Sequence, residues 1–358
     1  MLPAQEGDCL VIRYGPSEKK KCVLVDAGRA WTYKHALKRY LSDHDVREIE
    51  LLVVTHVDRD HIDGMLALMR DSSIGLAVRN VWFNTYDHLI GNAIEVLQES
   101  DDIESFGARM GEELSPLIVE NAWPWNRQFD GFAVCLAQPP VPRVMDVGGL
   151  RLTLLSPDSA KLEKLTPVWE RECRKAGIEP GGTLEEYVVE EDDLEAFGSI
   201  DIERLAALPF ENDRSKANGS SIAFILEYDG RRLLLAGDAH ADLLTQQLGL
   251  LGASPASPIE LDAFKVPHHG SQYNVSRELL ELMECKHYLV STNGNYFEHP
   301  DDVAMARLVK FGTDDSTVHF NYKSEHNRHW QNAAWQRTYK YNVAYPCLLY
   351  TSPSPRDS

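Results

Sequence analysis

The strongest constraint on this chain is an apolar run that leads directly into a cluster of histidines and aspartates. The run, residues 49–54 (IELLVV), is short enough to be a buried strand. The next segment, THVDRDHIDG at 55–64, places four ligand-type side chains within six positions: His56, Asp58, Asp60 and His61. Imidazole and carboxylate at this density fit two divalent cations better than one. A solvated loop is the simpler alternative, but the apolar strand that delivers all four side chains favours a metal site.

Two further predicted strand ends carry residues of the same kind. Asp238 follows the apolar run of LLLAGD, where a carboxylate could bridge two metals, and VPHHGS supplies His268 and His269. Because open sheets gather function at one end of their strands, the three strand ends predict one shared site.

Composition limits the class of protein. The chain has 358 residues, of which 43% are hydrophobic and 25% charged, as in soluble globular proteins. No apolar run approaches the roughly 18 residues of a membrane helix, and the start lacks the features of a signal peptide. The six cysteines form no CxxC pair. We therefore expect a cytoplasmic protein with reduced thiols and no membrane association.

The charge balance bears on the substrate. Lys plus Arg is 36 and Asp plus Glu is 55, which gives a net charge of −19. Such a chain repels a polyanion as a whole, so we expect no strong grip on duplex DNA. The charge balance does not exclude phosphate substrates, because a metal site supplies positive charge locally.

Local patterns predict alternating strands and helices. The first part reads as a hairpin at 9–14 and 22–25, a helix at 33–42, a strand at 49–54, a polar loop at 55–63 and a helix through 65–69. Next come a strand at 78–83, helical stretches near 90–120 and strand-like segments at 132–136 and 150–155. From residue 220 the pattern predicts a hairpin around a DG turn, and then helix 241–248, strand 263–266, helix 276–283, strand 288–291 and helix 300–310.

We expect one domain over residues 1–346. The acidic stretch around 185–213 reads as an inserted solvated helix and loop. Residues 347–358 are set apart from the fold, because CLLYTSPSPRD at 347–357 resembles the translation of a sequencing adapter. On that reading the natural protein continues beyond Pro346; a Ser/Pro-rich disordered terminus is the alternative.

The motifs together resemble a known family. Asp26 in LVDAG, then THVDRDH, LLAGD and KVPHHGS, in this order, resemble the metallo-β-lactamase superfamily. The closer resemblance is to the hydrolase domain of ComEC-type competence proteins and to related phosphorylcholine esterases, over roughly residues 3–312. It implies an α/β fold of the αββα type, a four-layer sandwich of two mixed β-sheets flanked by helices, with a dinuclear site at one edge.

The resemblance also implies roles for single residues. His56 and Asp58 would hold one metal, Asp60 and His61 the other, and Asp238 would bridge the two. His269 is the expected last ligand and His268 the expected substrate contact, although these two roles could be exchanged. Asp26 would fix the ligand loop by hydrogen bonds.

Some positions depart from the family pattern. Asp63 replaces a glycine that is common in the motif, and its charge is favourable at a helix N-terminus. No histidine occurs between His88 and His240, so a mid-chain ligand is absent or replaced. Asp58 stands where β-lactam-hydrolysing enzymes usually have histidine, which makes Mn²⁺ a rival to Zn²⁺.

The sequence leaves the roles of four other polar residues undecided. Asn218 and Ser221 in NGSS either line the site or form a turn. His299 either donates to a phosphate oxygen or merely precedes a helix, and the position of His88 relative to the site is undetermined.

The function implied is a hydrolase with two divalent metal ions that attacks with a metal-bridging hydroxide. Its expected substrate is a small-molecule or nucleic-acid phosphodiester, a preference that comes from the resemblance. Asp60 and Asp238 would orient the hydroxide, and His268 would neutralise charge in the transition state. Two alternatives are a hydrolase of a carbonyl substrate (lactone, thioester or β-lactam) and a non-enzymatic, metal-stabilised interaction module.

Overall fold

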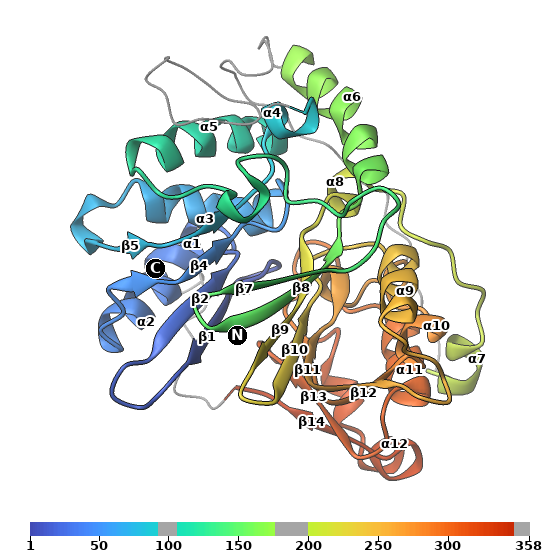
Figure 1. Cartoon of the computed structure of the whole chain (residues 1–358). Helices are drawn as coiled ribbons and strands as arrows, with labels where there is room; N and C mark the ends of the chain where they lie inside the picture. Colours follow the sequence, from blue (N-terminus) through green and yellow to red (C-terminus); the bar gives the residue numbers. More distant parts are fainter. Residues whose placement is uncertain (92–105, 176–199, 347–358) are drawn as a thin grey trace.

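Two β-sheets form the centre of the structure, a computed structural model that describes residues 1–91, 106–175 and 200–346 (Figure 1). The first sheet has the order β1-β2-β4-β6. Its strands are β1 Leu10–Tyr14, β2 Lys21–Val25, β4 Leu51–Val53 and β6 Val81–Trp82. β1 and β2 pair as an antiparallel hairpin, whereas β2, β4 and β6 run parallel.

The second sheet has the order β14-β13-β12-β11-β10-β9-β8-β7. Its strands are β7 Arg143–Val147, β8 Leu150–Ser156, β9 Ala223–Tyr228, β10 Arg231–Leu235, β11 Ile259–Lys265, β12 Met283–Val290, β13 Ser316–Phe320 and β14 Tyr341–Ala344. Pairing is antiparallel from β7 to β10 and parallel from β10 to β14. Both sheets are therefore mixed.

Alternation along the strands builds three apolar layers. Val23 and Val25 of β2 face Phe224 of β9 in the layer between the sheets. Leu24, which points to the opposite side of β2, packs with the helices outside the first sheet. Leu234 of β10 likewise packs with the helices outside the second sheet. Because successive side chains of a strand alternate between faces, each sheet buries both of its faces.

Helices cover the outer face of each sheet (Figure 1). Those packed on the first sheet are α2 Lys38–Asp43, α3 Arg59–Met69, α4 Tyr86–Leu89, α5 Phe106–Glu120 and α6 Ser159–Lys175. Those packed on the second are α7 Ile202–Ala206, α9 Ala241–Leu250, α10 Arg277–Leu280 and α11 Asp302–Phe311. The short helices are α1 Ala30–Thr32, joined to α2 by a π-helical turn, α8 Lys216–Gly219 and α12 Ala333–Tyr339. The predicted αββα fold is confirmed.

The loop expected at 55–63 is partly helical. Helix α3 begins at Arg59, directly after the extended residue Asp58, whose carbonyl accepts from the amides of His61 and Ile62. Asp60 and His61 therefore lie in the first turn of a helix. The start of α3 could not be recognised in the sequence, because apolar residues at helical spacing begin only at Ile62.

Several other predicted boundaries were wrong. The predicted strand at 49–54 is divided, because Glu48–Ile49 (β3) pairs with Ala77–Val78 (β5) in a separate two-stranded sheet. Residues 132–136 form no strand, since the amides of Val134 and Leu136 bond to an asparagine side chain and to a loop carbonyl. The helix expected at 276–283 ends at Leu280, and β12 begins at Met283.

The acidic stretch packs on the core in its described part. Ile202 and Ala206 of α7 are buried against the second helical layer. The guanidinium of Arg307 on α11 donates to the carbonyls of Leu208 and Pro209. A fully solvated helix and loop is therefore wrong for residues 200–213. Residues 185–199 and the tail 347–358 lie outside the described residues.

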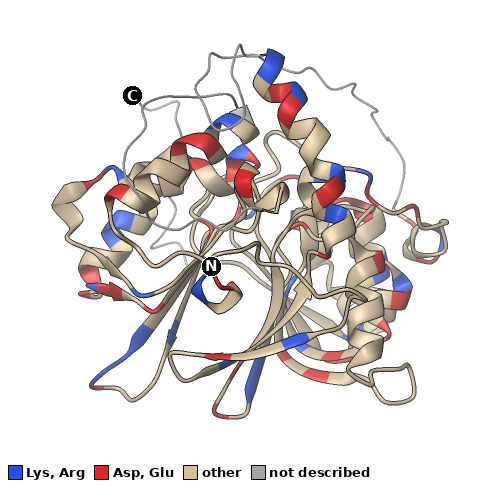
Figure 2. Ribbon diagram, turned by 45° about the horizontal axis from the view of Figure 1, so that its top comes forward, with Lys and Arg blue, Asp and Glu red and all other residues tan. Residues whose placement is uncertain are grey.

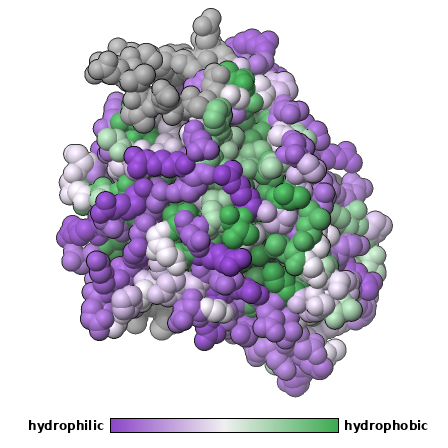
Figure 3. Space-filling view, in the orientation of Figure 1, coloured by the Kyte–Doolittle hydropathy of each residue, from purple (hydrophilic) through white to green (hydrophobic). Residues whose placement is uncertain are grey.

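Charged residues are common on the surface (Figure 2). Acidic and basic residues are spread over the outer helices and loops (Figure 2), and smaller hydrophobic areas lie between hydrophilic ones on the face seen in Figure 3. Within the described ranges, no helix has both the length and the apolarity needed to cross a membrane.

Candidate metal centre

The predicted site residues meet where the carboxyl ends of the central strands come together. Hydrogen bonds join these ends: the Asp26 amide donates to the Val53 carbonyl, and the Ile222 amide reaches across to the Thr55 carbonyl of the other sheet. The His268 amide donates to the carbonyl of Gly237. The backbone thus fixes the loops after β2, β4, β10 and β11 around one point.

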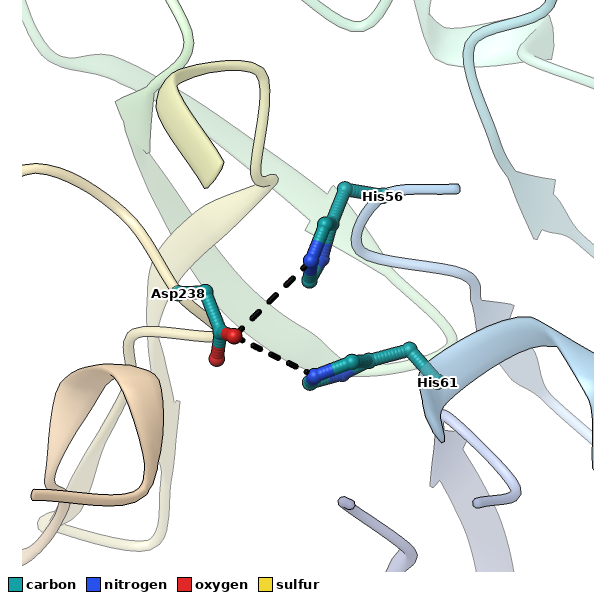
Figure 4. A group of neighbouring side chains, drawn as sticks. All are labelled: His56, His61 and Asp238. Carbon is teal, nitrogen blue, oxygen red and sulfur yellow. Dashed lines mark ion pairs between the residues drawn. The ribbon is translucent and has the colours of Figure 1, made fainter. Parts of the chain in front are cut away.

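Two histidines of the first sheet converge on one carboxylate of the second (Figure 4). The Asp238 Oδ2 atom lies 3.3 Å from His61 Nε2 and 3.8 Å from His56 Nε2. All three residues are buried, and their ligand atoms are close enough to hold one metal ion.

A second group adjoins the first and shares His61. His269 Nε2 lies 3.1 Å from Asp60 Oδ2 and 3.3 Å from His61 Nε2. Asp60, His61 and His269 are also buried and close enough to hold an ion. Asp238 Oδ2 lies 3.6 Å from His269 Nε2, so this carboxylate faces both groups.

Asp58 stands at the mouth of the centre. Its Oδ2 atom is 3.4 Å from His56 Nε2, and its side chain is 41% exposed. It therefore lies beside the first group, on the solvent side.

Unpaired buried atoms support a cation in this centre. His56 Nε2 and Asp238 Oδ1 are buried and have no hydrogen-bond partner. Leaving such atoms unsatisfied costs free energy. A divalent ion held by imidazole nitrogens and carboxylate oxygens would satisfy them, so the donor set fits Zn²⁺ or Mn²⁺.

The charges of the centre are strongly coupled. Burial alone would lower the pKa of His61, but the carboxylates of Asp238, Asp60 and Asp26 raise it well above its usual range. Burial would raise the pKa of Asp238, yet His61, His269 and His268 hold it well below its usual range. Without a cation, a proton on His61 therefore offsets part of the negative charge of these carboxylates.

Hydrogen bonds behind the centre orient two of the rings. Asp26 accepts from the amide and hydroxyl of Thr55, at 2.8 and 2.7 Å, and from His61 Nδ1 at 2.8 Å. His269 Nδ1 donates to the carbonyl of Ser291 at 2.7 Å. Each ring thereby presents its Nε2 atom to the centre, the arrangement usual for metal-binding histidines.

The two neighbouring histidines have different surroundings. Both adopt left-handed backbone conformations, with φ of 45° and 53°, and their ring planes are 67° apart. The side chain of His269 is 1% exposed, whereas that of His268 is 23% exposed. His268 Nε2 stays 4.0 Å from Asp238 Oδ2. The strained turn therefore directs one ring inward and the other to the mouth.

Asp213 and Asn274 hold the ring of His268, and neither was predicted from the sequence. The His268 Nδ1 atom lies 3.0 Å from Asn274 Oδ1 and 3.5 Å from Asp213 Oδ2. Burial would lower the pKa of His268, but Asp238 and Asp213 raise it to about 9. Asp213 is the last residue of the acidic stretch that was predicted to be solvated. Nothing in its sequence context therefore indicated a contact with His268.

The NGSS segment lies in the wall of the site. The Asn218 side-chain amide donates to Asp213 Oδ2 at 2.7 Å, while its Oδ1 atom is buried without a partner. Ser221 Oγ accepts from the Asp238 amide at 3.2 Å. Both residues are buried.

His299 reaches the site and His88 does not. The ring of His299 lies 5.2 Å from that of His268, and its Nδ1 atom is 3.2 Å from Asp301 Oδ1. His88 instead caps helix α4 by accepting from the Thr85 amide, and burial lowers its pKa to about 4.

A buried ion pair behind Asp238 was also missed. The Lys265 ammonium pairs with Asp8, and both side chains are 1% exposed. The Nζ atom donates to the Gly237 carbonyl at 3.3 Å and lies 3.8 Å from Asp238 Oδ1. Lys265 belongs to the KVPHHGS motif, but no signal marks Asp8, which precedes the first strand.

Part of the chain is similar in sequence to a known protein family. Residues 3–133 match the model of the Metallo-beta-lactamase superfamily. This stretch, which contains Asp26 and the whole THVDRDH segment, is similar to that superfamily. Asp238, His268 and His269 lie beyond it and join the site through the second sheet. A search of curated proteins finds no match to the chain.

Proposed function

We propose that this protein is a hydrolase that holds two divalent metal ions and cleaves phosphodiester bonds. The observation that carries the proposal is that two adjoining groups of buried imidazoles and carboxylates share His61, and that Asp238 of the first group faces His269 of the second. Pairs of metal ions in such sites serve in-line displacement at phosphorus.

The proposed ligands divide between the two ions. His56 and Asp58 would hold one ion, the group of Asp60, His61 and His269 would hold the other, and Asp238 would be shared by the two. This set of three histidines and three aspartates is rich in oxygen, which suits Mn²⁺ as well as Zn²⁺.

Bound there, two divalent ions would lower the pKa of a shared water and stabilise the attacking and leaving oxygens. The chain's own residues supply the rest. Asp60 and Asp238 accept hydrogen bonds from the attacking water and so orient it. Asp26 positions His61 by the hydrogen bond to Nδ1.

His268 is the proposed contact to the phosphate. It stands at the mouth, and its Nδ1 atom faces the Asp213 carboxylate, which favours a protonated ring. A protonated imidazole can donate to a phosphate oxygen whose negative charge grows in the transition state. His299 adds a second ring beside it, and Asn218 and Ser221 line the wall.

Support for a phosphodiester, rather than a carbonyl substrate, comes from two sources. Asp58 and the HHGS segment resemble the ComEC-type hydrolase domain. The protonated His268 at the mouth also suits an anionic substrate better than a neutral lactone or thioester.

The test uses purified protein reconstituted with Mn²⁺ or Zn²⁺ and three substrates: bis-p-nitrophenyl phosphate, single-stranded DNA and a lactone. Metal-dependent cleavage of the phosphodiesters is expected, with loss of turnover in Asp238→Ala. Glu260→Gln is the matched control, because Glu260 is an exposed carboxylate on β11. Hydrolysis of the lactone alone would assign a carbonyl substrate. Metal retention without any turnover would indicate a non-enzymatic module.

A further inference from the structure

A row of aromatic rings connects an exposed tyrosine to the candidate metal centre. The Tyr296 ring is 4.6 Å from the Phe297 ring, and the Phe297 ring is 6.1 Å from that of His299, with planes 26° apart. His299 in turn contacts His268, which faces Asp238. Tyr296 is 61% exposed. Tyr296, Phe297 and His299 are called the aromatic strip below.

Backbone hydrogen bonds fix the loop that carries the strip. At its start, the Asn293 amide donates to the Gln5 carbonyl at 2.8 Å. At its end, the Asp301 amide donates to the Gly270 carbonyl, and Asp301 Oδ2 accepts from the Gln272 amide at 2.6 Å. The strip is therefore held against the HHGS turn before any substrate arrives, which lowers the entropy cost of binding.

Acidic residues are unevenly placed around the strip. Residues 263–277 and 285–297, which build this side of the mouth, contain no Asp or Glu, although the chain has 55 such residues in 358. The exposed carboxylate Glu298 lies within the strip, and Asp301 pairs with His299. Carboxylates on this side of the mouth therefore lie at the end of the strip and not along residues 285–297.

We infer that the aromatic strip binds the nucleobase of a nucleotide whose phosphate lies at the metal centre. A single exposed aromatic ring needs no explanation. The Tyr296 and Phe297 planes are 78° apart. Each ring of the row therefore offers its own face to a planar group on the substrate whose phosphate lies at the proposed contacts. Bases stack on such side chains without regard to sequence.

This inference rests on the proposed phosphodiesterase function and narrows it. The substrate would be a nucleotide ester or a single strand, because a base stacked and paired within a duplex has no free face to offer. The acidic balance of the chain, which disfavours a grip on duplex DNA, agrees with this choice.

The test compares two esters with the same leaving group, thymidine 5′-p-nitrophenyl phosphate and methyl p-nitrophenyl phosphate, on the metal-loaded full chain. The wild type should prefer the thymidine ester in kcat/KM. Tyr296→Ala should reduce that preference by about tenfold, because the stacking ring is lost. Tyr296→Phe, which keeps the ring, should retain it. Calorimetric binding of thymidine 5′-monophosphate should weaken by a similar factor in Tyr296→Ala.

Tyr40→Ala is the matched control. Tyr40 also stacks on a histidine, His44, with 4.1 Å between ring centroids, but it belongs to α2. Its substrate preference should equal that of the wild type. Equal use of both esters by the wild type, or an unchanged preference in Tyr296→Ala, would overturn the inference and leave the phosphodiesterase standing.

Failure of the function itself has a different signature. If the wild type cleaves neither ester, the proposed function fails and binding alone decides the inference. Weaker binding of thymidine 5′-monophosphate to Tyr296→Ala then supports the strip, and unchanged binding overturns it.

Discussion

The Nε2 atoms of His61 and His269 lie 3.3 Å apart, although the two residues are 208 positions apart in the chain. Each ring has its Nδ1 atom committed as a donor, to Asp26 in one case and to the carbonyl of Ser291 in the other. Neutral rings would therefore turn two lone pairs toward each other. Such a contact is repulsive unless a proton or a cation lies there, so protons and metal compete for this position.

Metal affinity should consequently fall as the pH falls. The pKa of His61 is raised well above its usual range by Asp238, Asp60 and Asp26, despite burial. A metal ion must displace that proton, so binding releases protons and strengthens as the pH rises toward the raised pKa. Zn²⁺ titrations at pH 6 and 8, with proton release measured in weakly buffered solution, test this. Equal affinity at both pH values without proton release would contradict it.

Metal content provides the second prediction. The wild type should hold close to two divalent ions per chain, because two groups of ligand atoms adjoin. Asp238→Ala should lower that content and abolish turnover, since its carboxylate faces both groups. Elemental analysis after gel filtration measures it, with Glu260→Gln as the control. Full occupancy in Asp238→Ala would remove this residue from the metal centre.

The sequence predicted the sheets and the gathering of the motifs better than it predicted their details. Apolar strands that end in His56, Asp238 and His268 pointed to one edge, and the structure brings all three together there. The start of α3 was missed because helix periodicity is invisible where Asp60 and His61 replace apolar residues. These two side chains face the candidate metal centre and not the apolar core.

Residues that act from a distance could not be predicted. Asp213 touches His268 from the end of an acidic stretch, and such stretches are usually solvated. Asp8 meets Lys265 although 265 − 8 = 257 positions separate them, and neither position has a local pattern that predicts the pairing. Contacts of this kind follow from the packing of the two sheets, which a single sequence does not display.

The pair of Lys265 and Asp8 provides a stability prediction. Both side chains are buried, so Lys265→Met leaves the Asp8 carboxylate without its partner. We expect a loss of about 3–5 kcal/mol in the free energy of unfolding. Lys286→Met is the control, because Lys286 is 66% exposed and its pair with Asp262 is worth about 1 kcal/mol at most. Urea denaturation of both variants measures the difference, and similar losses would show that the buried pair is not needed.

The pH dependence of stability provides a further prediction, for the metal-free protein. Despite burial, Asp238 and Asp213 raise the pKa of His268 from 6.5 to about 9. The protonated ring therefore stabilises the folded state fully below pH 6.5, and this contribution disappears as the pH rises through about 9. It amounts to at most about 3 kcal/mol. Thermal melts in EDTA from pH 6 to 10 should show this decline, and His268→Gln should flatten it. An equally steep decline in His268→Gln would assign it to another group.

The last prediction separates the two neighbouring histidines. His269 is buried, with Nε2 directed at Asp60 and His61, whereas His268 stands at the mouth. His269→Ala should therefore lose metal. His268→Ala should keep its metal and lose about 10²–10³ in kcat, the usual cost of removing one donor to the transition state. Metal analysis and kinetics on both variants decide between the roles. Metal loss from His268→Ala alone would exchange them, and normal behaviour of both variants would place the HHGS turn outside the reaction.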